Sequence, residues 1–210
     1  MSSNSKITTV LNRHVPNAAQ PYCLELWLKY PFSLQITPKR LSKLGDYRYH
    51  KGKGTHIITL NATLNRYAFL ITYIHEIAHL LAFQQHGFKI APHGKEWKAS
   101  FRQLMQPLLT NDVFPEDVLP PLQNYMRNPK AASGSDQKLS LALQQYDQQD
   151  GSVPLSLVQP EQKFQFREMT FVKESVRRTR ALCRDVKSGK RYLVSEIARV
   201  RLLREETGGV

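Results

Sequence analysis

The sequence predicts an α+β protein that ends in a smaller, mostly β, basic module. Two short stretches rich in apolar and β-branched residues stand among helical patterns in the first half, and a polar stretch then precedes a hairpin signal near the C-terminal end. The 210 residues, 41% hydrophobic and 22% charged, have the composition of an ordinary globular protein. Collagen-like, fibrous and wholly disordered chains are therefore excluded.

The first three predicted elements are a helix and two strands. Pro21 is placed to start a helix, which runs to about Tyr30 because Pro31 stops it. The mixed apolar stretch 32–37 predicts an extended strand, and the β-branched stretch 56–60 predicts a second one.

Two further helices follow these strands. Asn61 and Asn65 are both suitable N-caps for a long helix that runs to about residue 85, where Gly87 closes it. The last helix is predicted from residue 94 or 95 to residue 105.

The charge distribution predicts three segments. Residues 1–125 carry a net charge of +7, residues 126–160 are neutral, and residues 161–210 carry +6. The middle segment is rich in Gln, Ser, Gly and Pro, so we expect a polar linker with one short helix around residues 139–146. A main domain over 1–125 and a basic β-rich module over 161–210 flank it.

The formal net charge of +13 indicates a polyanionic partner, and nucleic acid is the leading candidate. Cys23 and Cys183 are too far apart in sequence for a C-x-x-C motif, which fits a reducing compartment. The most apolar stretch, residues 67–83, is interrupted by ionisable side chains, and no apolar leader is apparent. We therefore expect a cytoplasmic, DNA-associated protein that is neither secreted nor membrane-spanning.

His75, Glu76 and His79 form an H-E-x-x-H motif. Residues four apart lie on one helix face, so both imidazoles can bind one zinc ion while the adjacent Glu76 reaches its water. A chain of this composition would contain roughly 0.01 such motifs by chance. The competing interpretation is a pair of core histidines with Glu76 as an ion-pair partner. Three clustered ionisable groups on a buried helix are costly without compensation, which favours a metal site.

A third ligand has to come from elsewhere in the chain. His86 lies about 10 Å beyond His79 along a continuous helix, which is too far for the same ion. Glu96 and Glu116 stand in no recognisable ligand motif. His93 is the best choice, because Gly87 ends the helix, residues 88–92 can turn the chain back, and Gly94 lets the backbone pass close to the ion.

The motif at 75–79, followed by Pro92, His93, Gly94 and Trp97, resembles the SprT-like zinc metalloprotease family, which includes the Spartan proteases. In that family H-E-x-x-H is followed by a third zinc histidine in an H-G-x-x-[FW] context, and all these positions match. Residues 45–48 and 58–61 also look like the family's strand region ahead of the helix. The resemblance covers about residues 15–110.

The resemblance implies a zincin-like minimal protease with His75, His79 and His93 as ligands of one zinc ion and Glu76 as the catalytic carboxylate. It further implies protein substrates that are crosslinked to DNA. Many relatives carry a four-cysteine zinc ribbon after the protease domain, whereas the C-terminal segment here has only Cys183. We expect that segment to keep a ribbon-like β shape without metal.

The chemistry expected of this set is metal-assisted hydrolysis of a peptide bond. Three neutral imidazoles leave a fourth zinc position for water, whose pKa falls from 15.7 toward about 7. Glu76 takes the proton of that water and can return it to the leaving amine. Tyr47, Tyr49 and Tyr73 are all candidates for stabilising the oxyanion, and the sequence does not choose among them.

Two basic patches are candidate nucleic-acid contacts. The first comprises Lys39, Arg40, Lys43, Arg48, Lys51 and Lys53, and the second comprises Arg177, Arg178, Arg180, Arg184, Lys187, Lys190 and Arg191. Tyrosines interleave the first patch, although a solvated sheet edge protected by its charges explains it equally well. The second surrounds a predicted hairpin turn at Ser188 and Gly189. Beyond Ser195 both a strand and a short helix fit the spacing.

Three functions compete at this point. The first is a zinc-dependent endopeptidase acting on DNA-associated proteins. The second is a non-catalytic nucleic-acid-binding module with structural zinc, which is disfavoured because structural sites normally have four protein ligands and neither cysteine is near the motif. The third is a zinc hydrolase whose basic surface docks acidic protein partners.

Overall fold

The structure is a computed structural model that describes residues 3–38, 43–131 and 136–203. The chain forms two compact units, Met1–Asp147 and Gln148–Val210. Each unit has a hydrophobic core of its own.

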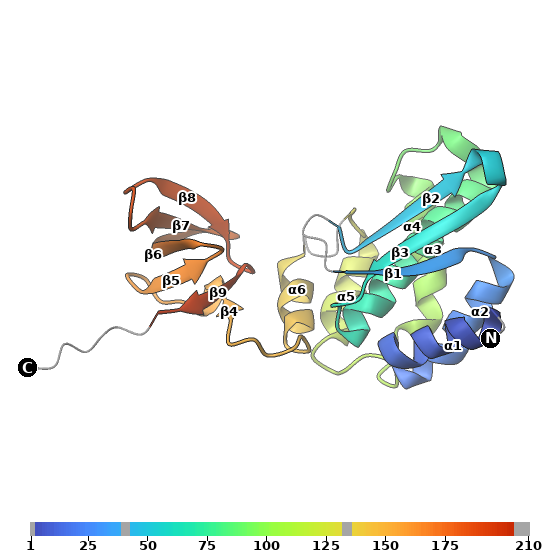
Figure 1. Ribbon diagram of the computed structural model, residues 1–210, viewed down its shortest axis with the longest axis horizontal. Helices are drawn as coiled ribbons and strands as arrows, with labels where there is room; N and C mark the ends of the chain where they lie inside the picture. The colour runs from blue at the N-terminus through green and yellow to red at the C-terminus, as the bar shows by residue number, and fades with distance from the viewer. Residues whose placement is uncertain (1–2, 39–42, 132–135, 204–210) are drawn as a thin grey trace, which may run out of the picture. The chain divides into compact units, whose positions relative to one another are not determined.

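The first unit contains a three-stranded sheet in the order β1-β3-β2 (Figure 1). Its strands are β1 (Ser33–Thr37), β2 (Gly45–His50) and β3 (Thr55–Asn61). β1 pairs parallel with β3, and β2 pairs antiparallel with β3 on its other side. Among the described strands of this sheet, β2 therefore has a neighbour along one side only.

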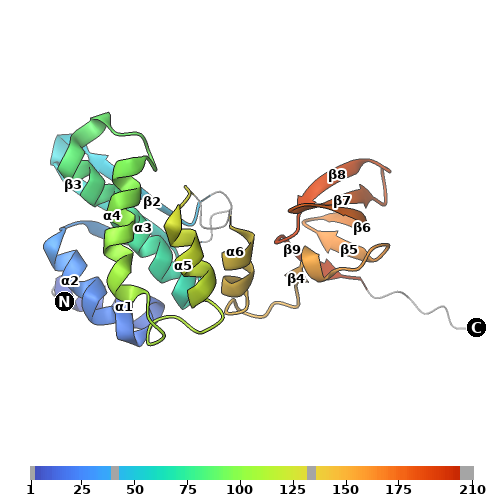
Figure 2. The ribbon, with the colours of Figure 1, turned by 180° about the vertical axis from the view of Figure 1, so that it is seen from behind.

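Helices make up most of the rest of the first unit. They are α1 (Ser3–His14), α2 (Gln20–Lys29), α3 (Arg66–His86), α4 (Lys95–Met105), α5 (Leu119–Arg127) and α6 (Gln137–Gln144), with the short 3-10 turns Asn17–Ala19, Lys51–Lys53, Gly87–Lys89 and Gln106–Leu108. α3 lies against β2 and β3, and α4 packs on α3 (Figure 2). No helix in the described part of the chain is both long and apolar enough to cross a bilayer.

The ends of α3 have clear local causes. The side chain of Asn65 accepts hydrogen bonds from the backbone N–H groups of Tyr67 and Ala68, at 3.1 and 3.0 Å, so Asn65 and not Asn61 is the N-cap. Gly87, with φ +70°, ends the helix as predicted. Between these ends nearly every side chain from 69 to 82 is buried, so α3 is the central helix of the unit.

The predicted helices and strands before residue 106 are all present, with ends within two residues of those expected. α1 and α5 were not predicted. α1 contributes only a narrow apolar row to the core, including Ile7 and Leu11, and its polar residues obscure the helical period.

Residues 126–160 are not a single polar linker, although the short helix expected around residues 139–146 is present as α6. α5 continues to residue 127, and α6 buries Leu139 and Leu143 in the core of the first unit. Leu155 and Val158 lie in the core of the second unit. The polar composition of the segment describes its exposed side chains, while its few apolar residues anchor it to both cores. The units therefore divide after Asp147 and not at residues 125 and 161.

The second unit is a six-stranded sheet in the order β4-β9-β5-β6-β7-β8, with every neighbouring pair antiparallel. Its strands are β4 (Val153–Pro154), β5 (Lys163–Phe166), β6 (Met169–Arg177), β7 (Arg180–Asp185), β8 (Arg191–Ser195) and β9 (Arg199–Leu202). A 3-10 turn, Leu155–Leu157, follows β4. The predicted turn between β7 and β8 is confirmed, with Gly189 at φ +69°. Between Ser195 and residue 203, the last described residue, the chain forms the strand β9 and not a helix.

A hydrophobic core holds this sheet together, and the expected β-rich C-terminal module is present. Phe164 and Phe171 stack at 5.7 Å between ring centroids, and Ala181, Cys183 and Val194 are buried with them. A zinc ribbon is held by metal–cysteine bonds. Here buried apolar side chains have that role, and no four-cysteine site is needed.

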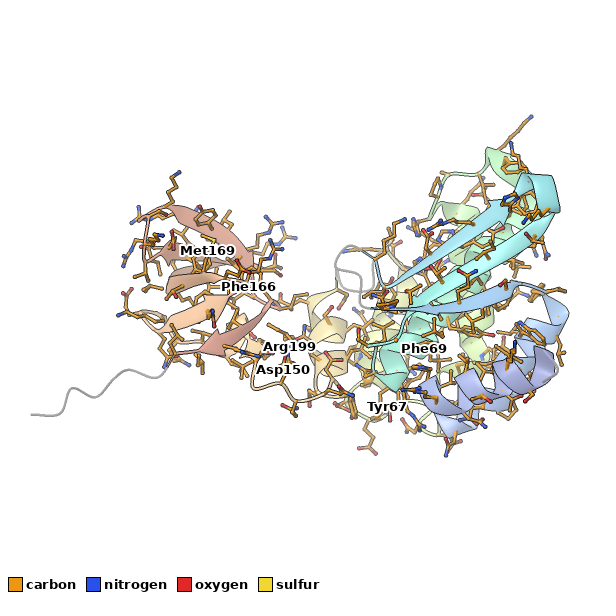
Figure 3. The ribbon with its side chains drawn as sticks, viewed as in Figure 1. Tyr67, Phe69, Asp150, Phe166, Met169 and Arg199 are labelled. Carbon is orange, nitrogen blue, oxygen red and sulfur yellow. The ribbon has the colours of Figure 1, made fainter. Side chains whose placement is uncertain are left out.

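A charged pair is buried within the second unit. Lys173 on β6 and Glu196 after β8 have side chains only 2% and 8% exposed, with 3.1 Å between Nζ and Oε1. Lys173 Nζ also donates to the carbonyl of Leu155 at 2.9 Å. Nearer the surface, Arg199 pairs with Asp150 at 3.5 Å (Figure 3). These contacts join β6, β9 and the segment around β4.

Replacing Lys173 alone by Met should lower the free energy of unfolding of the second unit by about 3–5 kcal/mol, because Glu196 is left as an uncompensated buried charge. The double variant Lys173→Met, Glu196→Met removes both charges and should recover most of this loss. Hydrogen–deuterium exchange of the β6 and β7 amides in the full chain measures the free energy of unfolding of the single and the double variant. Equal destabilisation of the two variants would show that packing, and not charge pairing, is responsible.

Candidate metal centre

Three histidine rings of the first unit meet at one point. His75 and His79 lie one turn apart on α3, and His93 lies in the loop before α4. The Nε2 atom of His93 is 3.1 Å from Nε2 of His75 and 3.0 Å from Nε2 of His79. Within the described ranges these three residues form the group of ligand side chains that can hold a metal ion.

The loop that carries His93 is shaped by backbone conformations at both ends. Gly87 turns the chain away from α3, and Gly94 is the N-cap residue of α4. His93 itself has φ +59°, a left-handed conformation that is uncommon for a residue with a side chain. A Cβ at Gly94 would meet the Ala91 carbonyl at 3.0 Å, so this glycine permits a close approach within the turn.

The chemistry of the three rings fits a bound cation. One ring nitrogen offers either one proton or one lone pair, so His93 Nε2 cannot satisfy both of its neighbours by hydrogen bonding. A cation accepts lone pairs from all three rings. Nitrogen ligands 2.0–2.1 Å from a tetrahedral zinc ion lie about 3.4 Å apart, close to the two separations observed.

The surroundings keep the rings neutral, as metal ligation requires. Burial, with smaller contributions from the other two rings, lowers the pKa of His75 to about 2. Burial and His93 lower the pKa of His79 to about 4, against an opposing effect from the carboxylate of Asp46. Burial also lowers the pKa of His93. Neutral imidazoles need not lose a proton before they bind a metal ion.

Trp97 packs against the whole group. Its ring centroid lies 4.6, 5.4 and 4.7 Å from those of His75, His79 and His93, and its indole N–H donates to the carbonyl of His75 at 3.3 Å. Phe101 stacks on the indole at 5.0 Å and also contacts the ring of His75, with 5.6 Å between centroids. Trp97 is 1% exposed, so it restricts the orientation of all three imidazoles.

The group lies in a cleft of about 550 Å³ in the first unit. Glu76, which is 5% exposed, lines this cleft together with the three histidines. Residues 43–47, at the start of β2, line the cleft next to them. Phe83, Phe88 and Ile90 make one part of the lining apolar.

Of the three tyrosines considered for the oxyanion, Tyr47 alone lines the cleft. Its hydroxyl lies 2.9 Å from Nδ1 of His56, and its ring is parallel to that of His79, with 6.3 Å between centroids. Tyr73 is buried with its hydroxyl on the carbonyl of Cys23, at 3.0 Å. Tyr49 is not part of the cleft lining and packs behind it, against the rings of Phe83 and His56.

The other candidate ligands lie outside the histidine group. His86 is exposed at the end of α3, as the spacing argument requires. Glu96 pairs with Lys95 at 3.9 Å, and Glu116 is exposed.

The first basic patch is partly neutralised within the described residues. Lys43 donates to Asp46 at 2.7 Å, and Arg48 bonds the other oxygen of the same carboxylate. Lys51 lies 4.5 Å above the ring of Phe88, and Lys53 is exposed. Lys39 and Arg40 lie outside the described residues.

The second basic patch divides between two turns of the second unit. Arg177, Arg178 and Arg180 are exposed at the turn between β6 and β7, and Lys187 and Lys190 are exposed between β7 and β8. Arg184 and Arg191 both donate to Glu174, at 2.9 and 2.8 Å. The arginines of the β6–β7 turn are therefore the better placed to bind an external anion.

In the sequence analysis, Gly45 and Trp97 appear only within stretches that resemble the family, and neither was given a role of its own. Gly45 begins a strand, where glycine is disfavoured unless another group approaches closely. That signal was available, but the group that approaches it could not be known from the sequence.

Comparison with known proteins gives one match. The model of the SprT-like family matches residues 24–118, a range that contains the three histidines, Glu76 and Trp97. No curated protein and no solved structure matches the chain.

The purified chain should bind about one zinc ion. His93→Ala should weaken zinc affinity by more than about 100-fold, since loss of a partner outside the ligand shell alone costs 10–100-fold. His86→Ala, the same change at an exposed histidine beyond the group, should leave affinity unchanged. Zinc content and calorimetric titration measure both. Equal loss in the two variants would contradict the choice of His93.

Proposed function

Because residues 24–118 place the chain in the SprT-like family, we propose that it is a zincin-like, zinc-dependent endopeptidase that acts on DNA-associated or DNA-crosslinked proteins. One observation carries this proposal: three imidazole nitrogens meet in a cleft that a buried carboxylate from the same helix also lines. A site with three protein ligands is typical of catalytic zinc, because a fourth position stays open.

His75, His79 and His93 would hold the zinc ion. When bound, zinc polarises a peptide carbonyl and makes water more acidic. The chain's own contribution is to keep the three rings neutral and oriented, through burial and the contacts of Trp97.

Glu76 is the proposed general base. It follows His75 directly on α3, so the same helix turn fixes both residues. Its carboxylate takes a proton from the attacking water and returns it to the leaving amine.

The outer edge of β2, which has no neighbouring strand among the described residues, supports an extended polypeptide as substrate. Asn61 N–H donates to the carbonyl of Leu44 at 3.0 Å, so the alternation of an antiparallel ladder turns the backbone groups of Gly45 and Tyr47 away from β3. Both residues line the cleft. A substrate segment can therefore add to the sheet as a further strand and lie across the cleft.

The basic turns of the second unit support the DNA part of the proposal. Arg177, Arg178 and Arg180 project from one tight turn, and their charges suit contacts with phosphates that carry little sequence preference.

One observation favours docking of acidic protein partners as a second candidate role for this unit. Leu193, 48% exposed, stands opposite Leu182 on β7, next to the pair formed by Arg184 and Arg191. Exposed apolar surface of this kind suits a protein contact better than a phosphate contact. A non-catalytic module with structural zinc is disfavoured, because the described residues group three ligands and not four.

Glu76→Gln keeps the size of the side chain but removes the proton acceptor. The variant should bind zinc as the wild type does and lose peptide hydrolysis by at least about 100-fold. Cleavage of an unfolded protein substrate, together with zinc content, tests this. Near-normal activity would remove Glu76 from the proposed mechanism.

Changing Arg177, Arg178 and Arg180 together to Gln should weaken DNA binding by the full chain. The slope of log affinity against log salt should become shallower by about 0.9 for each duplex phosphate that the variant no longer neutralises. A control triple variant with the same charge change uses exposed residues of the first unit: Arg13, Lys29 and Lys138 to Gln. Equal effects of both triples would show a response to net charge only. No effect of the first triple would favour protein docking.

A further inference from the structure

Gly45, the first residue of β2, lies against α3 at Glu76. A Cβ built on this glycine would stand 2.6 Å from Oε1 and 3.0 Å from Cγ of Glu76, and 2.7 Å from Cγ2 of Thr72. Real Cβ atoms do not approach other atoms at under 3.0 Å. Any other residue at position 45 therefore competes for the space of the Glu76 side chain.

Backbone conformation does not explain the glycine. Gly45 is absent from the glycines with positive φ and stands in a regular ladder position opposite Leu60 on β3. Glycine weakens a strand, and in such positions it marks a close approach by another group. Here the approaching group is the carboxylate proposed as the general base.

The neighbours of Gly45 differ in how easily they can move. The hydroxyl of Thr72 donates to the carbonyl of Ala68 at 2.7 Å, which fixes its methyl group toward Gly45. α3 is buried along most of its length, and Trp97 bonds the carbonyl of His75. The carboxylate of Glu76, at the end of a flexible side chain, is the atom group that gives way most readily.

We propose that Gly45 is a positioning residue for Glu76. Its missing side chain leaves the space in which the carboxylate lies, at the edge of the sheet where the backbone groups of Gly45 point away from β3. The carboxylate is thereby held beside the strand on which an extended substrate would dock. This inference rests on the proposed function, in which Glu76 takes the proton of the attacking water.

Gly45→Ala in the full, zinc-loaded chain tests the proposal. We expect kcat to fall at least tenfold, KM to change less than threefold, and zinc content to stay near one per chain. Gly52→Ala is the matched control, because a Cβ there would meet its nearest neighbour, a His50 ring carbon, at an ordinary 3.6 Å. The control should behave as the wild type. Wild-type kcat in a folded Gly45→Ala variant would overturn the proposal.

A measurement independent of activity separates this proposal from the proposed function. In protein labelled with 13C-glutamate, the carboxyl resonance that disappears in Glu76→Gln identifies Glu76. It should shift in Gly45→Ala and not in Gly52→Ala. An unchanged resonance would overturn the positioning role even if the wild type hydrolyses peptides. A shifted resonance would support it even if no peptidase activity is found.

The double variant Gly45→Ala, Thr72→Ser lacks the methyl group that would lie 2.7 Å from the new Cβ. It tests whether a low kcat in Gly45→Ala results only from loss of folding. This double variant should unfold at a higher temperature than Gly45→Ala and still show the low kcat and the shifted resonance. If Thr72→Ser restores kcat, the strain lies on the helix and the positioning role is wrong. Failure of both variants to fold would assign Gly45 to packing and also overturn it.

Discussion

The burial of ionisable side chains on α3 is the constraint on which the first unit depends. His75 and Glu76 are 9% and 5% exposed on a helix that packs on most of its surface. Burying polar side chains without partners lowers the stability of the fold. The structure groups them: a loop histidine meets the two helix histidines, and Trp97 covers all three rings. The low pKa values of His75 and His79 follow from that burial.

The same constraint determines how the sheet meets the helix. β2 approaches α3 so closely at Gly45 that no side chain fits, and the neighbouring residues of β2 form one wall of the cleft. β2 is also the strand whose outer side has no neighbouring strand in the described sheet. β2 thus provides both the close packing against α3 at Gly45 and the backbone groups that face outward at the edge of the described sheet.

The second unit, in contrast, folds with few apolar residues and a large positive charge. A small aromatic and aliphatic core is joined by the buried pair of Lys173 and Glu196. Glu174 neutralises Arg184 and Arg191 on the outer face. Arg177, Arg178 and Arg180 are exposed at the turn between β6 and β7, and Lys187 and Lys190 between β7 and β8, where they are accessible to an anionic partner.

The sequence by itself determined what depends on near neighbours: the end of the long helix at Gly87, the turn at Gly189, and the one-turn spacing of His75 and His79. It also favoured His93 as the third ring of the group. Only the tertiary structure decided that β2 meets Glu76 at Gly45, and that residues 126–160 divide between two cores. Caps, turns and helical spacing are set by residues a few positions apart. Close approaches between elements distant in the chain depend on how whole faces pack, which no local pattern records.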